Sequence, residues 1–83
     1  MGEATTAQDR WRPTTRYERR LVRTLAVYLE AGSHKEAAHW LDISESTCRQ
    51  RVSALIRRIG ATNATQAVWA LRRELEAETR GRA

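Results

Sequence analysis

The sequence lacks most of the groups that build catalytic and metal sites. Cys48 is the single cysteine, which excludes an internal disulfide and any zinc site built from cysteines. His34 and His39 have no cysteine or carboxylate partners at a metal-ligand spacing. The chain also has no glycine-rich phosphate loop and no plausible Ser/His/Asp set. We therefore expect no enzyme activity, no cofactor and no bound metal.

Long hydrophobic runs are also missing. No apolar stretch approaches the length needed to span a bilayer, and the first residues do not have the charged and apolar regions of a secretory signal. With 83 residues, of which 41% are hydrophobic, the chain can form one small domain with a modest core. We expect a cytoplasmic protein.

Acidic residues are scarce in two segments that are rich in arginine. The six arginines of the segment Arg10–Arg23 have only Asp9 and Glu18 as acidic neighbours. The four arginines of residues 44–60 stand against Glu45 alone. Together with the net charge of +5, this distribution favours a polyanionic partner.

Apolar periodicity and helix caps predict an all-α fold of four helices. Residues 1–13 are polar and lack periodicity, so we expect a flexible basic arm that ends at Pro13. The four helices then occupy residues 14–78, and residues 79–83 form a frayed tail. No pattern in the chain predicts a strand or an internal repeat.

Capping residues divide residues 14–78 into its helices. The segments Thr15-x-x-Glu18 and Ser33-x-x-Glu36 have the form of capping boxes, and a glycine is typical of the position after a helix. The expected N-caps are Thr14 or Thr15, Ser33, Ser44 and Asn63, and the expected stops are Gly32 and Gly60. In the third helix the buried stripe is Cys48, Val52, Leu55 and Ile59, and in the fourth it is Ala64, Ala67, Val68, Leu71 and Leu75.

The second and third helices have the features of a helix-turn-helix unit. Ala37 and Ala38 would let the two helices cross closely, and Asp42-Ile43 makes a short turn with Ile43 held in the core. The outer face of the third helix is polar, so it can contact base edges: Arg49 suits guanine and Gln50 suits adenine. The alternative is a plain four-helix domain whose third helix merely shows a solvated charged face.

Phosphate contacts are expected beside these base contacts. The amide groups near Ser46 and Thr47, at the start of the third helix, could hold a phosphate. Arg51, Arg57 and Arg58 are better placed for phosphates than for bases, and such contacts position a protein without specifying a sequence.

A longer pattern resembles the LuxR/GerE-type DNA-binding domain. The match covers about residues 25–70 without a gap, against a family pattern that runs roughly K-E-I-A-x-x-L-x-I-S-x-x-T-V-K-x-H-x-x-x-I-x-x-K-L-G and then N-R-T-E-A-V. The residues that carry the resemblance, identical or similar to the pattern, are Gly32, Ser33, His34, Lys35, Glu36, Ala37, Ala38, Leu41, Ile43, Ser44, Thr47, Cys48, Arg49, Arg51, Leu55, Arg58, Ile59, Gly60, Asn63, Thr65, Gln66, Ala67 and Val68.

The resemblance implies a four-helix domain with its third helix in the major groove of DNA, commonly dimerised through the fourth helix. By this resemblance Thr47 takes the place of a threonine that contacts a phosphate, and Cys48 that of a valine at the groove. Arg49 stands in place of a lysine that contacts DNA, and Arg51 in place of a histidine beside the DNA backbone. The full set of candidate DNA-contacting residues is Lys35, Glu45, Ser46, Thr47, Cys48, Arg49, Gln50, Arg51, Ser53, Arg57 and Arg58. A prokaryotic, nucleoid-associated transcription regulator is the implied function.

The chain also departs from the family pattern. The usual opening T-x-R-E-x-E-V-L is missing in this register, although Thr15, Arg16 and Glu18 lie about one turn upstream. Ala64 replaces a frequent arginine near the start of the fourth helix. With no receiver or ligand-binding domain before it, the module resembles the single-domain, GerE-like members.

Two tryptophans fall outside the predicted core faces. Trp69 on the fourth helix is a candidate for the homodimer interface together with Arg72 and Arg73, and Trp40 is expected to be covered by the arm that carries Trp11. Packing of each indole against long arginine stems is the alternative.

A second function stays open. A protein-interaction module that binds RNA polymerase or pairs with a larger regulator is also favoured by Trp40, Trp69 and the acidic end at Glu74, Glu76 and Glu78. Cys48 lies early in a helix beside Arg49, conditions that can lower a thiol pKa, but a free cysteine more often acts as a small apolar residue. The histidines are expected to lie at the solvent-exposed surface.

Overall fold

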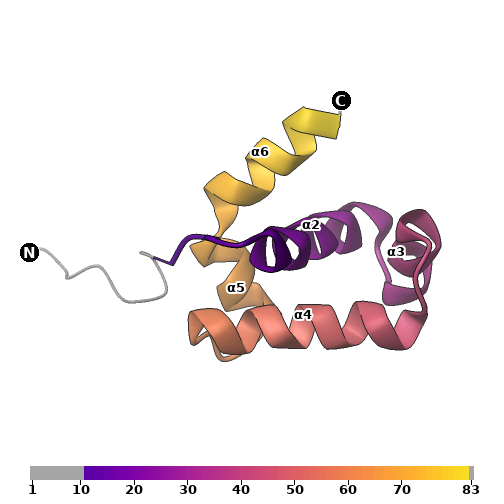
Figure 1. Ribbon diagram of the computed structural model, residues 1–83, viewed down its shortest axis with the longest axis horizontal. Helices are drawn as coiled ribbons and strands as arrows, with labels where there is room; N and C mark the ends of the chain where they lie inside the picture. Colours follow the sequence, from indigo (N-terminus) through magenta and orange to yellow (C-terminus); the bar gives the residue numbers. More distant parts are fainter. Residues whose placement is uncertain (1–10, 83) are drawn as a thin grey trace, which may run out of the picture.

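The computed structural model describes residues 11–82, and this part of the chain is all-α. It contains five helices and no strand, which confirms that the fold is all-α but not that it has four helices (Figure 1). The helices are α2 (Arg16–Ala31), α3 (His34–Leu41), α4 (Glu45–Ile59), α5 (Ala64–Ala70) and α6 (Arg72–Arg82).

The capping residues begin and end the first helices as predicted. The Thr15 hydroxyl accepts a hydrogen bond from the Glu18 amide at 3.0 Å, and the Ser33 hydroxyl accepts one from the Glu36 amide at 3.1 Å. Gly32 follows α2 with φ of 91°, a left-handed conformation that glycine adopts without steric cost. Local sequence therefore determines where these helices start and stop.

The main core lies between α2 and the helices that follow it. In Figure 1, α3 lies at the end of the molecule where α4 begins, and α5 lies at the opposite end. The buried side chains of this core are Leu21, Val22, Leu25 and Ala26 of α2, Val52, Leu55 and Ile59 of α4, and Ala67, Ala70, Leu71 and Leu75 of the C-terminal part. The apolar stripe predicted for the third helix is thus buried as expected.

The single fourth helix predicted from the sequence is in fact two helices, α5 and α6. Leu71 has φ of −106° and ψ of 17°, so the helical path breaks between α5 and α6 although no glycine or proline stands there. Leu71 and Leu75 are both buried against the core, which α6 reaches by leaving α5 in a new direction (Figure 1). Residues 79–82 continue α6 and are not a frayed tail, while Ala83 lies outside the described residues.

Residues 11–13 also differ from the expected flexible arm. Trp11 is half-buried and packs against the main core, and Arg12 forms an ion pair with Glu74 of α6, with Nε and Oε2 3.0 Å apart. Trp11 therefore does not cover Trp40, which is 54% exposed. The remainder of the predicted arm, residues 1–10, lies outside the described residues.

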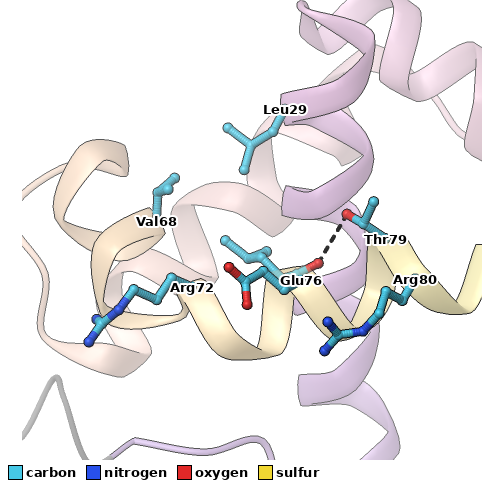
Figure 2. A pocket seen from close by; sticks show the side chains of 7 residues that line it. Leu29, Val68, Arg72, Glu76, Thr79 and Arg80 are labelled. Carbon is cyan, nitrogen blue, oxygen red and sulfur yellow. Dashed lines mark hydrogen bonds between the residues drawn. The ribbon is translucent and has the colours of Figure 1, made fainter.

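Helices α2, α5 and α6 border an open, mostly apolar hollow of about 410 Å³ on the surface. Leu29 and Val68 face it from two sides, and the α6 residues line its floor (Figure 2). The hydroxyl of Thr79, one of these α6 residues, donates a hydrogen bond to the Leu75 carbonyl at 3.1 Å. None of the helices in residues 11–82 has the length and apolar character needed to cross a bilayer.

Candidate nucleic-acid interface

A tight turn joins α3 to α4. Asp42 adopts a left-handed conformation, with φ of 58° and ψ of 47°, which a short polar side chain tolerates better than most. The Ile43 amide donates to the Ala38 carbonyl at 3.0 Å, and the Ile43 side chain packs into a small core. Ser44 then caps α4, so three residues separate the two helices as the sequence predicts.

The two helices cross over small side chains. Ala37, Ala38, Val27 and Cys48 form a second core cluster, and Cys48 is completely buried in it. Burial raises the pKa of the Cys48 thiol, and the charges of Arg51 and then Arg49 oppose that rise. The Cys48 side chain therefore cannot contact DNA, which corrects its place among the candidate residues, and its pKa is raised rather than lowered. Its apolar role in the buried stripe of α4 is the one observed.

The outward face of α4 is polar and open to solvent. Thr47 and Arg51 are partly covered, whereas the other candidates on the two helices are exposed. The exposed candidates are Lys35 of α3 and Glu45, Ser46, Arg49, Gln50, Ser53, Arg57 and Arg58 of α4. The fold thus leaves every predicted contact residue except Cys48 at least partly accessible on α3 or α4.

Arg49 forms an ion pair within this face. Its Nη2 lies 2.6 Å from the Glu45 carboxylate one turn earlier, and both side chains are largely exposed. An exposed pair of this kind contributes at most about 0.5 kcal/mol to stability. A stronger hydrogen-bond acceptor can therefore displace Glu45 as the partner of Arg49. In the part of the chain that the structure describes, the side chains of Gln50 and Arg57 have no hydrogen-bonding partner.

The start of α4 presents a hydroxyl pair. The Ser44 hydroxyl accepts from the Thr47 amide at 3.0 Å and donates to the Thr47 hydroxyl oxygen at 2.8 Å. This arrangement leaves the Thr47 hydroxyl hydrogen available to an acceptor outside the helix. With the positive end of the helix dipole beside it, that acceptor is best an anion.

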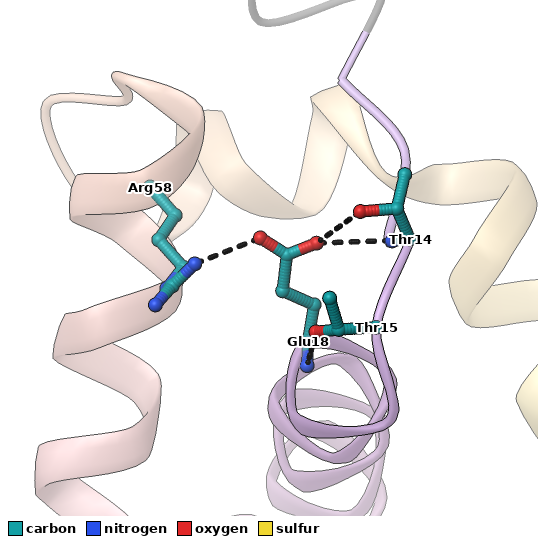
Figure 3. A network of polar contacts seen from close by, with 4 residues as sticks. All are labelled: Thr14, Thr15, Glu18 and Arg58. Carbon is teal, nitrogen blue, oxygen red and sulfur yellow. Dashed lines mark hydrogen bonds and ion pairs between the residues drawn. The ribbon is translucent and has the colours of Figure 1, made fainter.

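Arg58 connects the C-terminal end of α4 to α2. Its Nη1 lies 2.8 Å from a Glu18 carboxylate oxygen (Figure 3). Its guanidinium also lies over the Tyr17 ring, 5.1 Å from the centroid. Glu18 also accepts hydrogen bonds from the Thr14 amide and hydroxyl, and the Thr14 amide, ahead of Arg58, lowers the pKa of the Glu18 carboxyl. Arg58 thus stabilises the α2–α4 pair in addition to its candidate phosphate contact.

His34 is not the solvent-exposed residue that the sequence predicts. Its ring stacks on Tyr28 with 4.4 Å between centroids, and its Nδ1 lies 3.6 Å from the Cys48 sulfur. Burial lowers the pKa of His34, and the nearby charge of Arg49 lowers it further. His34 and Cys48 lie 14 positions apart in the sequence, and Glu18 and Arg58 lie 40 positions apart. Contacts over such separations leave no periodic signal in the sequence.

The dimer candidates lie around the α5–α6 break. Trp69 is 66% exposed, and the Arg72 guanidinium lies 4.4 Å from its ring centroid while donating to the Trp69 carbonyl at 2.7 Å. Arg73 is exposed beside them. The packing of Trp69 against an arginine was the alternative left open by the sequence, and it does not remove the indole from solvent.

Comparisons of the chain with models of protein families, with curated protein sequences and with solved structures gave no match.

Proposed function

We propose that this protein is a sequence-specific, double-stranded DNA-binding transcription regulator of the LuxR/GerE type. The proposal has one principal support: the α3–turn–α4 unit packs over Ala37, Ala38 and Cys48 and leaves a polar, arginine-bearing face of α4 open. That face and the short turn are what a helix needs to enter the major groove. The basic composition of the chain agrees with a polyanionic partner.

Within this proposal α4 reads the bases. Arg49 exchanges Glu45 for guanine O6 and N7, and Gln50 pairs with adenine, each contributing about 1–3 kcal/mol of discrimination. Thr47, at the capped start of α4, and Arg57 contact phosphates and set the position of the helix without specifying a sequence.

The resemblance adds detail to the proposal. In the proposed correspondence, α2 to α5 are the four helices of the LuxR/GerE-type fold, since the similar residues end near residue 70, and α6 is an addition to it. A homodimer on a two-fold-related site completes the proposal, with the exposed Trp69, Arg72 and Arg73 as its interface residues. A regulator of this kind would work at the nucleoid of a prokaryotic cytoplasm.

Binding titrations with duplex DNA of selected sequence test the proposal. We expect affinity that falls steeply with salt, a change of sequence preference for Arg49→Ala, and a uniform loss over all sequences for Arg57→Ala. Arg80→Ala, which removes one exposed arginine of α6, is the matched control and should leave both properties unchanged. Unaltered affinity and preference in Arg49→Ala would show that α4 does not lie in the groove.

A protein-interaction module is the second candidate, favoured by the exposed Trp69 and the apolar hollow beside Leu29 and Val68. In this case the chain binds RNA polymerase or a larger regulator without DNA. Sedimentation of the purified protein with RNA polymerase in high salt separates the two functions: a complex abolished by Trp69→Ala and indifferent to Arg49→Ala supports the interaction module.

A further inference from the structure

Four arginines line the outer surface of α2 beside the α3–α4 unit. Two shallow hollows adjoin them, one of about 330 Å³ against α6 and one of about 240 Å³ against α3 and α4. Arg20 and Arg23 line both hollows, so the two form one continuous surface. The basic residues of this surface, here called the arginine track, are Arg16, Arg19, Arg20 and Arg23 of α2 and Arg51 of α4.

Basic side chains greatly outnumber acidic ones along the arginine track. Arg12, Arg49 and Arg58 each contact a carboxylate, but among the described residues no side chain of the track forms a hydrogen bond or ion pair. Arg16 and Arg20 repel one another as like charges four residues apart on a helix. Among the residues that line the two hollows, Glu78 is the single acid. A bound polyanion would relieve this repulsion.

Trp40 lies at the α3 side of the track. It is 54% exposed and lines the smaller hollow together with Arg20, Arg23 and Arg51. The indole N–H can donate to a phosphate oxygen, and the flat ring can pack against a sugar. A phosphate flanked by deoxyribose therefore matches both the guanidinium groups and the indole.

We propose that the arginine track and Trp40 bind the phosphodiester backbone of the same duplex whose major groove receives α4, an inference that rests on the proposed function. Arg51 connects the two surfaces, because it lies on the flank of α4 and also lines the hollow with Arg20 and Arg23. A duplex seated on the outward face of α4 carries one of its strands along that flank. Arg16 to Arg23 span about 10 Å of helix axis, enough for more than one phosphate.

The length of the track also favours a strand over a free nucleotide. A mononucleotide could occupy the hollow at Trp40 but would not reach Arg16 and Arg19, which line the other hollow. A strand neutralises both ends of the track at once. These contacts would add affinity and salt dependence, without adding sequence preference.

Salt titration of Arg23→Ala, with Arg80→Ala as the control, tests this inference on the full chain. Both substitutions remove one exposed helical arginine, and neither alters the core. We expect Arg23→Ala to reduce the slope of log affinity against log salt by about one per bound protomer and to weaken all duplexes severalfold, with an unchanged preferred sequence. Trp40→Ala should weaken binding in the same uniform way, and Arg80→Ala should match the wild type.

The outcomes separate this inference from the proposed function. If Arg23→Ala and Arg20→Ala bind specific sequences with an unchanged salt slope, the arginine track does not contact the DNA backbone. The proposed role of α4 would then still hold. A free mononucleotide that binds as tightly as a duplex, and is equally sensitive to Arg23→Ala, overturns the assignment to a DNA backbone. Absence of duplex binding by the wild type refutes the proposed function and this inference with it.

Discussion

The α3–turn–α4 unit and the C-terminal pair α5–α6 are built on different principles. In the first, Ser33 and Ser44 cap the helices, Asp42 makes the turn, and two alanines let the helices cross. In the second, Asn63 caps α5, but the break that redirects α6 occurs at Leu71, a buried residue with no turn preference. Capping and turn residues mark the bounds of the first unit, whereas the break in the second coincides with the burial of Leu71 in the main core.

Leu71→Ala should have the largest effect on stability. The side chain is completely buried at the point where α5 gives way to α6, so its removal leaves a cavity and costs about 2–5 kcal/mol. Leu29→Ala, at a leucine that is 45% exposed, should cost much less. Urea unfolding followed by circular dichroism measures both, and equal midpoints would show that the α5–α6 break does not depend on core packing.

Ala38→Leu should be the next most damaging substitution and should separate the two regions. The added side chain has no room against Cys48 and costs about 1–3 kcal/mol, because α3 must move away from α4. Ala77→Leu, at an exposed alanine of α6, is the control and should leave the unfolding midpoint nearly unchanged. We expect Ala38→Leu also to weaken DNA binding by more than its loss of folded protein explains; a normal affinity of the folded fraction would contradict the crossing as the basis of the interface.

Ser44→Ala and Asn63→Ala remove equivalent caps from the two regions. Each side chain accepts one amide hydrogen bond at its helix start, from Thr47 and from Gln66 respectively, so each loss should cost about 1 kcal/mol. The DNA affinity should fall in Ser44→Ala alone, because the Thr47 hydroxyl then loses the partner that orients it. Equal affinities of the two variants would argue against a phosphate at the start of α4.

Glu18→Gln should produce the smallest effect, seen in the pH dependence of stability. The folded-state pKa of Glu18 is below its ordinary value, so its contribution is present above the unfolded-state pKa and is lost as the pH falls through the folded-state pKa. Unfolding midpoints of wild type and variant should therefore differ near pH 7 and converge in acid. A constant difference between them at every pH would mean that the ionised carboxylate is not what stabilises α2 against Arg58.

The same division explains how much of the molecule could be predicted from its sequence. Ser33 and Gly32 act within one helical turn, and the stripe from Cys48 to Ile59 repeats every three or four residues. These local patterns identify α2, α3, α4 and the exposed face of α4. The buried position of Cys48 followed from that stripe, and the resemblance misplaced it at the groove.

Features that depend on distant partners could not be predicted in this way. The break at Leu71, the contact of Trp11 with the main core and the pair Arg58–Glu18 each join segments with no shared periodicity. The arginine track belongs to the same class, because Arg51 joins the α2 arginines only when α2 and α4 are packed together. The periodicity of one helix shows which residues share a face of that helix. It does not show which faces of two different helices lie side by side.

Selection of binding sites from a random duplex library, by wild type and Arg49→Ala in parallel, tests the central claim most directly. If α4 reads the major groove, the wild type should enrich a defined motif, and Arg49→Ala should enrich one that has lost its preference for guanine at a single position while keeping the remainder. No enriched motif for the wild type, or the same motif for both proteins, would contradict the account.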